Sequence, residues 1–235
     1  MKIALIGHGG MGKTVEKIAL ERGHEITAVI EAGDALDFAG ADVAIDFSLG
    51  ESVFENAKAA SEAGVALIIG STGWYDDVEK VSELTKNIPC LWSSNFSIGV
   101  NLYFKIVEEA SKLVNKFDEY DIWGHEIHHH NKADSPSGTA KTLSEILLKN
   151  IDRKDKIFEE KLDRKREDNE IHFSSVRGGP VNFAHTIAFD SAADKILISH
   201  EARNRDGYAL GALKAAEWLA KKDVGFYAMN DFLNI

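Results

Sequence analysis

The sequence predicts an α/β fold: an N-terminal Rossmann-type parallel sheet, then a C-terminal α+β domain with a mixed or antiparallel sheet. Two observations indicate this. In the first ninety residues, short apolar segments alternate with helical patterns, as in repeated βα units. Beyond residue 120, the strand patterns become longer, which is typical of a second domain with a different sheet.

The expected elements follow one another along the chain. Buried strands are predicted at 2–6, 25–30, 43–47, 65–69 and 90–92, with helices at 11–21, 52–62 and 76–86 between them. A long helix is expected over 97–116, longer strands at 121–127, 171–177, 181–190 and 195–202, and a helix from Ser137 to about Leu148. The last helix, 207–221, has Asp206 as its candidate cap and is expected to return to the first domain. We therefore expect one domain of residues 1–97 and 207–235, and a second domain of residues 98–206.

Composition excludes several classes of protein. The formal net charge of −11 argues against a nucleic-acid partner, because phosphate backbones require a basic surface. No apolar run approaches the roughly 20 residues of a membrane-spanning helix, so no membrane association is expected. The lone cysteine, Cys90, fits a small core residue in a reducing compartment, and we expect a cytoplasmic protein. Residues 152–170 hold 15 charged residues of nearly balanced sign, which we interpret as a solvated loop and frayed helix.

A glycine loop follows the first predicted strand. Gly7, Gly9 and Gly12 fit the pattern G-x-G-x-x-G, with Gly10 and Met11 between them, and the loop opens the first predicted helix. Such glycines allow a tight turn, close approach of the backbone to a pyrophosphate, and close packing of helix and strand. The helix N-terminus also attracts the anion. This context predicts a dinucleotide site, against the alternative of a glycine-rich turn without a ligand.

Glu31 ends the second predicted strand. An acidic residue at this place can accept hydrogen bonds from the adenosine ribose hydroxyls, which favours NADH. Ala32 and Gly33 provide no cation to compensate a 2′-phosphate. The alternative is a glutamate that only faces solvent.

The segment from Glu126 to Ala140 combines histidines, a lysine and a helix start. His128 and His129 follow a predicted strand, and Lys132 comes shortly after them. A histidine there can titrate near neutrality and deliver a proton. The helix start at Ser137, Gly138 and Thr139 offers backbone N–H groups and hydroxyls to a carboxylate or phosphate. The segment therefore predicts an acid catalyst beside an anion site.

Simpler interpretations apply to some of these residues. Ser137 can be an N-cap, which is compatible with function. A metal site is not expected, because adjacent strand residues point to opposite faces and neither a nearby cysteine nor an H-E-x-x-H helix is present. His130 is expected to be exposed and incidental, and His125 to be a strand residue.

Several segments together resemble the 4-hydroxy-tetrahydrodipicolinate reductase family, long called dihydrodipicolinate reductases. The most specific is Glu126-x-His128-His129-x-x-Lys132-x-Asp134-x-Pro136-Ser137-Gly138-Thr139-Ala140. The others are Asp46-Phe47-Ser48, Gly70-Ser71-Thr72-Gly73, Ser94 to Asn101, and Ser175-Val176-Arg177-Gly178-Gly179. The resemblance spans nearly the whole chain in the expected order.

The resemblance implies a reductase of a cyclic dicarboxylate in the diaminopimelate–lysine pathway, using NADH or NADPH, and typically a homotetramer joined through the sheets of the second domains. It implies that His128 is the proton donor and acceptor, Lys132 a second proton donor, and His129, Gly138 and Thr139 substrate contacts supported by Ser137. The implied cofactor contacts are Ser48, Gly70, Ser71, Thr72, Ser93, Ser94, Asn95 and Phe96. The chain departs from many members where Gly10 runs directly into Met11 and where Ala32 follows Glu31, since cations that could hold a 2′-phosphate are missing.

Two other functions are compatible with the same features. One is another two-domain NAD(P)-dependent dehydrogenase of an amino-acid pathway, such as an aspartate or homoserine dehydrogenase. The other is a non-catalytic dinucleotide sensor, which would keep the glycine loop but would not need the histidine and lysine beside a helix start.

Overall fold

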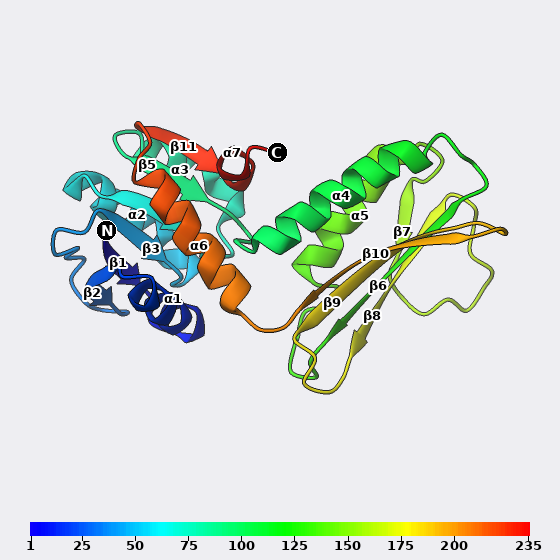
Figure 1. Ribbon diagram of the computed structural model, residues 1–235, viewed down its shortest axis with the longest axis horizontal. Helices are drawn as coiled ribbons and strands as arrows, with labels where there is room; N and C mark the ends of the chain where they lie inside the picture. Colours follow the sequence, from blue (N-terminus) through cyan, green and yellow to red (C-terminus); the bar gives the residue numbers. More distant parts are fainter. The chain divides into compact units, whose positions relative to one another are not determined.

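The computed structural model describes all residues, 1–235. The chain forms two compact units: unit 1 comprises Met1–Ile98 and Arg205–Ile235, and unit 2 comprises Gly99–Asn204. Each unit has its own sheet (Figure 1). No helix is both long enough and apolar enough to cross a membrane.

Unit 1 contains a six-stranded sheet in which every pair of neighbours is parallel, with the order β11-β5-β4-β3-β1-β2. Its strands are β1 (Lys2–Ile6), β2 (Glu25–Ile30), β3 (Val43–Asp46), β4 (Ala66–Ile69), β5 (Pro89–Trp92) and β11 (Gly225–Ala228). Its helices are α1 (Gly10–Glu21), α2 (Val53–Ala63), α3 (Val78–Leu84), α6 (Asp206–Leu219) and α7 (Met229–Leu233), with short 3-10 turns at Gly50–Ser52 and Tyr75–Asp77. These elements confirm the predicted Rossmann-type sheet.

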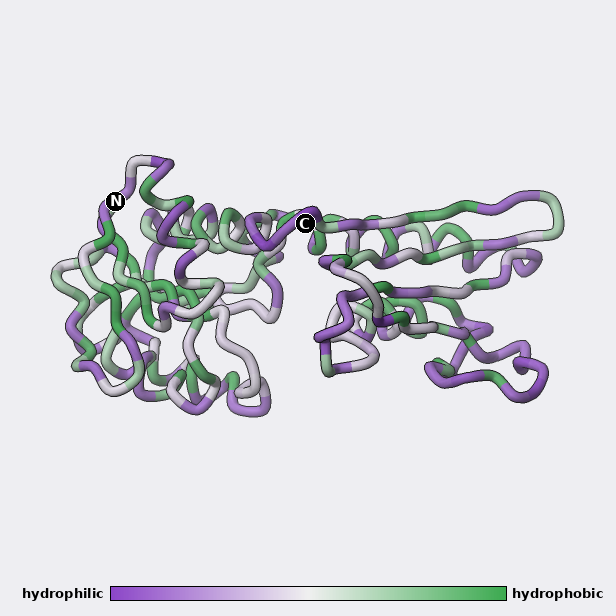
Figure 2. The backbone as a smooth tube through the Cα atoms, turned by 90° about the horizontal axis from the view of Figure 1, so that it is seen from below, coloured by the Kyte–Doolittle hydropathy of each residue, from purple (hydrophilic) through white to green (hydrophobic).

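Helices cover both faces of this sheet. Ile3 and Leu5 of β1 face one core, where residues of α1 and α6 pack against them. Ala4 and Ile6 face the other core, which α2 and α3 close. Because both faces are buried, the central strands β3 and β4 are apolar at nearly every position. In Figure 2, hydrophobic stretches, in green, run through the unit that contains the N-terminus. Cys90 lies in the second core and is fully buried, as expected.

Unit 2 contains a five-stranded mixed sheet with the order β10-β9-β6-β8-β7. Its strands are β6 (Asp121–His128), β7 (Lys156–Phe158), β8 (Glu170–Arg177), β9 (Phe183–Asp190) and β10 (Lys195–Ala202), and its helices are α4 (Ile98–Val114) and α5 (Gly138–Asn150). β6 is parallel to β8 and antiparallel to β9. Both helices pack on one face, where Val107 and Leu143 join a core with Phe173 and Phe189. The opposite face carries no helix (Figure 1).

The charged segment 152–170 differs from the predicted solvated loop and frayed helix. It contains β7 and a network of ion pairs with unit 2 strands. Lys154 is buried, and its ammonium donates to the Asp121 carboxylate at 2.7 Å and to the Asp168 carbonyl at 2.6 Å. Glu170 is also buried and accepts hydrogen bonds from Arg164 and Lys156. Alternating charge signs therefore reflect pairing across a sheet edge as well as solvation.

The last part of the chain also differs in detail. Arg205, rather than Asp206, occupies the N-cap position of α6, and Asp206 is the first residue of the helix. The sequence analysis did not predict β11 and α7, which follow α6. β11 extends the parallel sheet at its β5 edge, with Phe226 beside Cys90.

Candidate functional site

The predicted cofactor loops of unit 1 begin where neighbouring strands end. Gly7 follows β1, Phe47 follows β3, Gly70 follows β4 and Ser93 follows β5. Because these strands are parallel neighbours, the loops form one row along the carboxyl edge of the sheet. Ligands of open α/β sheets bind in a crevice at this edge.

The glycine loop has the close contacts that its pattern predicts. Gly7 adopts φ +85°, a left-handed conformation that favours glycine. A Cβ on Gly12 would lie 2.1 Å from the Gly7 carbonyl oxygen, so only glycine lets α1 approach the loop this closely. By contrast, a Cβ on Gly9 would have no atom within 4 Å. Gly9 therefore borders open space, where a ligand's phosphate could approach its backbone.

A cavity of about 560 Å³ lies beside this loop. Its lining includes the predicted cofactor residues Gly7, Gly9, Glu31 and Ser48. Apolar side chains of Ile6, Ile30, Leu36 and Leu49 form part of the same wall. A pocket that combines apolar walls with a few polar groups is suited to a nucleoside.

The charged groups that line this cavity are acidic. Glu31, Asp34 and Glu55 contribute carboxylates, and the lining contains neither lysine nor arginine. His8, in the glycine loop, has its Nε2 2.7 Å from the Glu16 carboxylate and its Nδ1 3.9 Å from Glu31. His8 was not among the predicted cofactor residues, although its position inside the glycine pattern was an available signal.

Other predicted cofactor residues lie outside this cavity's lining. Ser71 is buried, and its hydroxyl donates to the Asp46 carboxylate at 2.8 Å. The same carboxylate oxygen accepts the backbone N–H of Ser48 at 2.8 Å, so Asp46 connects the loops after β3 and β4. Gly70 packs against the Phe47 ring, where a Cβ would lie 2.2 Å from Cε1. Thr72 and Ser94 are exposed on these loops.

Two predicted contact residues have their side chains in the core instead. The Phe96 side chain is buried against Phe47, with ring centroids 6.1 Å apart. Met11 packs against the core beneath α1. Ser93 is also buried and forms a local turn, in which its hydroxyl donates to the Asn95 carbonyl at 2.9 Å. A cofactor could reach Phe96 only through its backbone, whereas Met11 is half-buried.

In unit 2, β6 directs Glu126 and His128 to the helix-covered face of the sheet. Side chains on a strand alternate between faces, and β6 alternates strictly between buried and half-buried residues. His128 is therefore buried, whereas His129 is half-buried and His130 is exposed. His130 is held at its Nδ1, which lies 3.0 Å from the Gly179 carbonyl.

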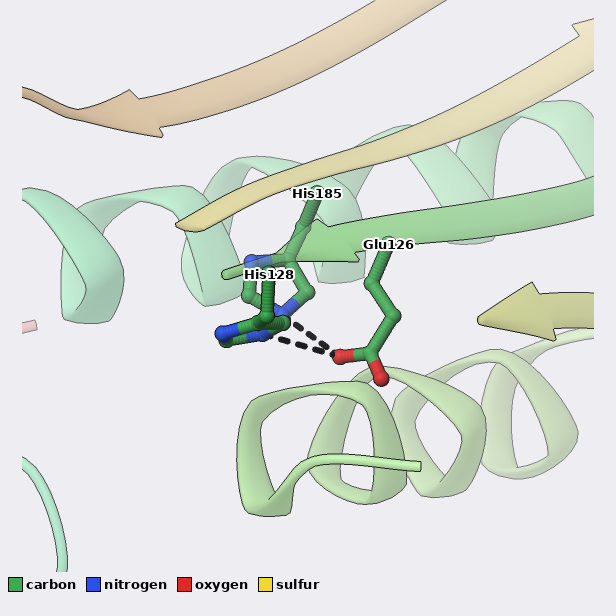
Figure 3. Close-up of side chains that lie close together, drawn as sticks. All are labelled: Glu126, His128 and His185. Carbon is green, nitrogen blue, oxygen red and sulfur yellow. Dashed lines mark hydrogen bonds and ion pairs between the residues drawn. The ribbon is translucent and has the colours of Figure 1, made fainter. Parts of the chain in front are cut away.

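Glu126 is the centre of a buried hydrogen-bonded cluster (Figure 3). One carboxylate oxygen accepts the Ser137 backbone N–H at 3.0 Å, the Ser175 hydroxyl at 2.8 Å and the Arg177 guanidinium at 2.8 Å. The other oxygen lies 3.1 Å from His128 Nε2 and 3.2 Å from His185 Nε2. Burial alone raises the pKa of the Glu126 carboxyl, but the hydrogen bonds it accepts hold that pKa well below its usual range. The cluster therefore contains an ionised carboxylate.

His128 is neutral near pH 7 in the absence of a ligand. Burial lowers the pKa of its imidazole to about 4, and the negative charge of Glu126 opposes this only in part. The nearby cations Lys132 and Arg177 lower the pKa further. This differs from the predicted titration near neutrality, because the sequence revealed neither the burial of His128 nor its proximity to Arg177. A bound dianion would counter those cations and raise the pKa again.

The helix start at Gly138 and the Lys132 side chain are groups that could bind an anion. The Ser137 hydroxyl caps α5 by accepting the Ala140 N–H at 3.2 Å, while the N–H groups of Gly138 and Thr139 have no partner in the chain. A Cβ on Gly138 would have no atom within 4 Å, so this helix end is open. Lys132 pairs with Asp134 at 2.7 Å and is only one quarter exposed.

Glu126, His128 and His185 also have side chains of the types that bind metal ions. Their ligand atoms lie within 4.8 Å of one another. However, the Nε2 atoms of His128 and His185 are both at hydrogen-bond distance from the Glu126 carboxylate, and the Arg177 guanidinium contacts the same carboxylate. A dication here would displace those hydrogens and meet a like charge, so this donor set suits a hydrogen-bonded network better than a metal.

Glu126 and Arg177 lie in segments that carry the family resemblance, but no role was predicted for them, and His185 was not predicted as a site residue. Glu126 shares an inward face with Ile122 and Gly124, and a charged residue at such a position is a usable signal. His185 on β9 lies directly opposite Glu126 on β6, although the two residues are 59 positions apart in the sequence. Only the register of the sheet reveals this contact.

Comparisons with known proteins agree with the fold and identify the family. The family described as "Dihydrodipicolinate reductase, N-terminus" matches residues 1–96, and "Dihydrodipicolinate reductase, C-terminus" matches residues 99–233. The chain is 39% identical to a 4-hydroxy-tetrahydrodipicolinate reductase of Christiangramia forsetii, covering 100% of this chain and 98% of the relative. It is 38% identical to one of Archaeoglobus fulgidus, covering 99% of this chain and 100% of the relative.

Among solved structures, a dipicolinate-bound dihydrodipicolinate reductase from Paenisporosarcina sp. TG-14 has a TM-score of 0.76 at 21% identity, with 97% of each chain covered. That likeness shows the fold. The full-length relatives and the two family matches confirm the resemblance drawn from the sequence. The chain belongs to the dihydrodipicolinate reductase family.

Proposed function

We propose that this protein reduces 4-hydroxy-tetrahydrodipicolinate to tetrahydrodipicolinate with NADH or NADPH, in diaminopimelate and lysine biosynthesis. The observation that carries the proposal is the arrangement in unit 2 of a histidine, a lysine and an open helix start. Membership of the reductase family supports it. The reducing environment favoured by the lone Cys90 supports a cytoplasmic location.

The two units have different tasks in this proposal. Unit 1, residues 1–98 and 205–235, binds the dinucleotide, with the pyrophosphate at Gly7, Gly9 and Gly10 and the start of α1. Unit 2, residues 99–204, binds the dicarboxylate. The loops at Gly70–Thr72 and Ser93–Phe96 extend the cofactor site along the sheet edge. The nicotinamide, when bound, supplies the hydride.

The residues of unit 2 bind the substrate and move a proton. The substrate carboxylates accept hydrogen bonds from Lys132 and from the Gly138 and Thr139 N–H groups, with His129 beside them. These contacts offset the cations around His128, which raises its pKa and favours the imidazolium. The ring hydroxyl leaves as water together with a hydrogen of the adjacent ring carbon. Hydride transfer to the resulting double bond leaves an anion, and His128 gives this anion its proton. Lys132 serves as a second proton donor.

A coupled assay tests this function. NADH or NADPH oxidation is followed at constant pH with the cyclic product of the preceding synthase. We expect His128→Ala to lower kcat by about 10²- to 10⁴-fold, the range of a general acid, and Lys132→Ala to raise KM and lower kcat. His130→Ala is the matched control, because this exposed histidine has no part in the proposed chemistry. Near-wild-type kcat in His128→Ala, or unchanged KM and kcat in Lys132→Ala, would contradict the assigned roles.

We further propose that NADH is the preferred cofactor. Glu31, Asp34 and Glu55 place three carboxylates around the cavity beside the glycine loop, with no lysine or arginine in its lining. A 2′-phosphate there would meet like charges without compensation, whereas ribose hydroxyls can donate to Glu31. The kcat/KM with NADH should exceed that with NADPH, and Glu31→Ala should lower the ratio of the NADH value to the NADPH value. A ratio that favours NADPH would contradict the proposal.

We also propose a homotetramer joined through the helix-free face of the unit 2 sheet. Trp123, Ala188 and Leu197 form one row across this face, and Leu197 remains 52% exposed. Val176, 49% exposed, continues the apolar surface beside Ile127. Sedimentation should give the mass of four 25.9 kDa chains, and Leu197→Asp should give smaller species. A monomeric wild type would contradict this assembly.

A further inference from the structure

The buried cluster around Glu126 restricts the hydrogen positions of two histidines. The Glu126 carboxylate is ionised, so it can only accept hydrogen bonds. Its second oxygen faces His128 Nε2 at 3.1 Å and His185 Nε2 at 3.2 Å. A bare nitrogen in either place would set a lone pair against the carboxylate. Both rings must therefore carry a hydrogen on Nε2, and the His185 hydrogen is shared with the Ser137 hydroxyl oxygen, which lies 3.1 Å from His185 Nε2.

The other nitrogen of each ring is then unprotonated. His185 Nδ1 is buried and has no partner, which leaves an unpaired acceptor rather than the costlier unpaired donor. His128 Nδ1 points away from the carboxylate (Figure 3), and it makes no hydrogen bond within the chain. The rings lie edge to face, with centroids 5.2 Å apart, so His185 also supports the orientation of His128.

We infer that Glu126 and His185 are positioning residues that hold the His128 ring with its hydrogen on Nε2, leaving Nδ1 as the nitrogen that exchanges the proton with the substrate. This inference rests on the proposed function. In the reaction, the His128 imidazolium gives its Nδ1 proton to the anion left by hydride transfer and returns to the neutral Nε2–H ring. Glu126 keeps its charge throughout and stabilises the imidazolium.

The surroundings of His128 predict how each variant changes its protonation. The charged and titratable groups facing it are Glu126 on β6, His185 on β9, Arg177 on β8 and Lys132 after β6. Glu126 favours the imidazolium, whereas His185 disfavours it. Removing the charge of Glu126 and removing the His185 imidazole should therefore shift the kcat–pH profile in opposite directions.

The first measurement uses the wild type. ¹⁵N NMR of the histidine side chains at neutral pH should show His128 with a protonated Nε2 and a bare Nδ1, assigned by comparison with His128→Asn. Finding the Nδ1–H tautomer in the wild type would overturn the inference. This result would not depend on the folding of any variant.

The second measurement uses turnover. In Glu126→Gln, we expect kcat to fall about 10- to 100-fold, a part of the 10²- to 10⁴-fold contribution of a general acid, with KM changing less. The limb of the kcat–pH profile that reports loss of the imidazolium should move to lower pH. In His185→Phe, which keeps a ring of similar shape, the same limb should move to higher pH. Ser175→Ala is the matched control, because it removes a donor from the other carboxylate oxygen and should keep the Nε2–H tautomer.

The outcomes separate this inference from the proposed function. Wild-type turnover with an unchanged kcat and pH profile in Glu126→Gln, or limb shifts of the same sign in both variants, would overturn the positioning role alone. Absence of wild-type turnover would overturn the proposed function, while the NMR measurement would still decide the tautomer.

Discussion

Alanine substitutions at Gly9 and Gly12, in the loop after β1, should separate the role of this loop in cofactor binding from its role in packing. At Gly12, a Cβ would lie 2.1 Å from the Gly7 carbonyl oxygen, 0.9 Å inside the 3.0 Å that Cβ contacts essentially never cross. The obstacle is backbone, so α1 or the loop has to move. At Gly9, a Cβ would meet no atom within 4 Å, and the backbone, at φ −73° and ψ −158°, is one that alanine adopts.

Gly12→Ala should therefore destabilise the folded protein by about 1–3 kcal/mol, the usual cost of overpacking. For a chain of this length, that lowers the Tm by about 2–4 °C per kcal/mol. Gly9→Ala should leave the Tm unchanged or slightly higher, because alanine restricts the unfolded chain. Its methyl group would instead occupy the space from which we expect a pyrophosphate to approach. Loss of one hydrogen bond to a charged group, about 1.5–3 kcal/mol, raises the NADH Kd about 10- to 100-fold.

The assay pairs thermal unfolding without cofactor with calorimetric titration of NADH. A Gly9→Ala protein with unchanged Tm and unchanged Kd would refute the placement of the pyrophosphate over Gly9. A Gly12→Ala protein as stable as the wild type would refute the packing argument.

Three further predictions follow from buried polar groups. The pKa of His128 is about 4 in the folded protein, whereas that of an unfolded histidine is about 6.5, so the unfolded state binds more protons between these pH values. The free energy of unfolding should therefore fall by at most about 3 kcal/mol as the pH falls from about 6.5 to 4. Denaturant titrations should show a smaller pH dependence of this free energy in His128→Asn, and an equal dependence would contradict the lowered pKa. Lys154→Ala should lower the free energy of unfolding by about 1–3 kcal/mol, because it removes a buried donor to Asp121 and to two backbone carbonyls. Lys161 is exposed in the same charged segment, so Lys161→Ala should change this free energy by less than about 0.5 kcal/mol. Equal effects in the two variants would contradict a stabilising role of the Lys154 hydrogen bonds. Asp46→Asn should cost about 1–3 kcal/mol and weaken NADH binding, because an amide cannot accept from Ser48, Ser71 and Asn56 together; unchanged unfolding and NADH affinity would show that the loops do not depend on it.

The regular elements of both units could be predicted from the sequence because their signals are local. The strands of unit 1 are short apolar runs between helical patterns, and β6 alternates between its two faces. The glycine loop and the helix start at Ser137 are likewise encoded in adjacent residues. β7 and β11 were not predicted, since one lies in a charged segment and the other in a short segment after the last strong helix.

The candidate site residues that are close together in the sequence could be predicted, whereas the contacts between residues of different strands could not. Lys132, Gly138 and Thr139 follow His128 closely in sequence, so their spacing indicated an anion site. The contact of Glu126 with His185 depends on the register of β6 and β9, and that with Arg177 on the neighbouring strand β8. The burial of His128, which makes it neutral near pH 7, depends on the same packing.

The most direct test of the proposed reaction is a single stoichiometric assay with the wild-type protein. NADH oxidation is recorded spectrophotometrically while 4-hydroxy-tetrahydrodipicolinate is supplied by the preceding synthase, and the product is identified by mass spectrometry. We predict one NADH oxidised for each tetrahydrodipicolinate formed. Tight NADH binding without oxidation of either NADH or NADPH would contradict the reductase function and favour a dinucleotide sensor.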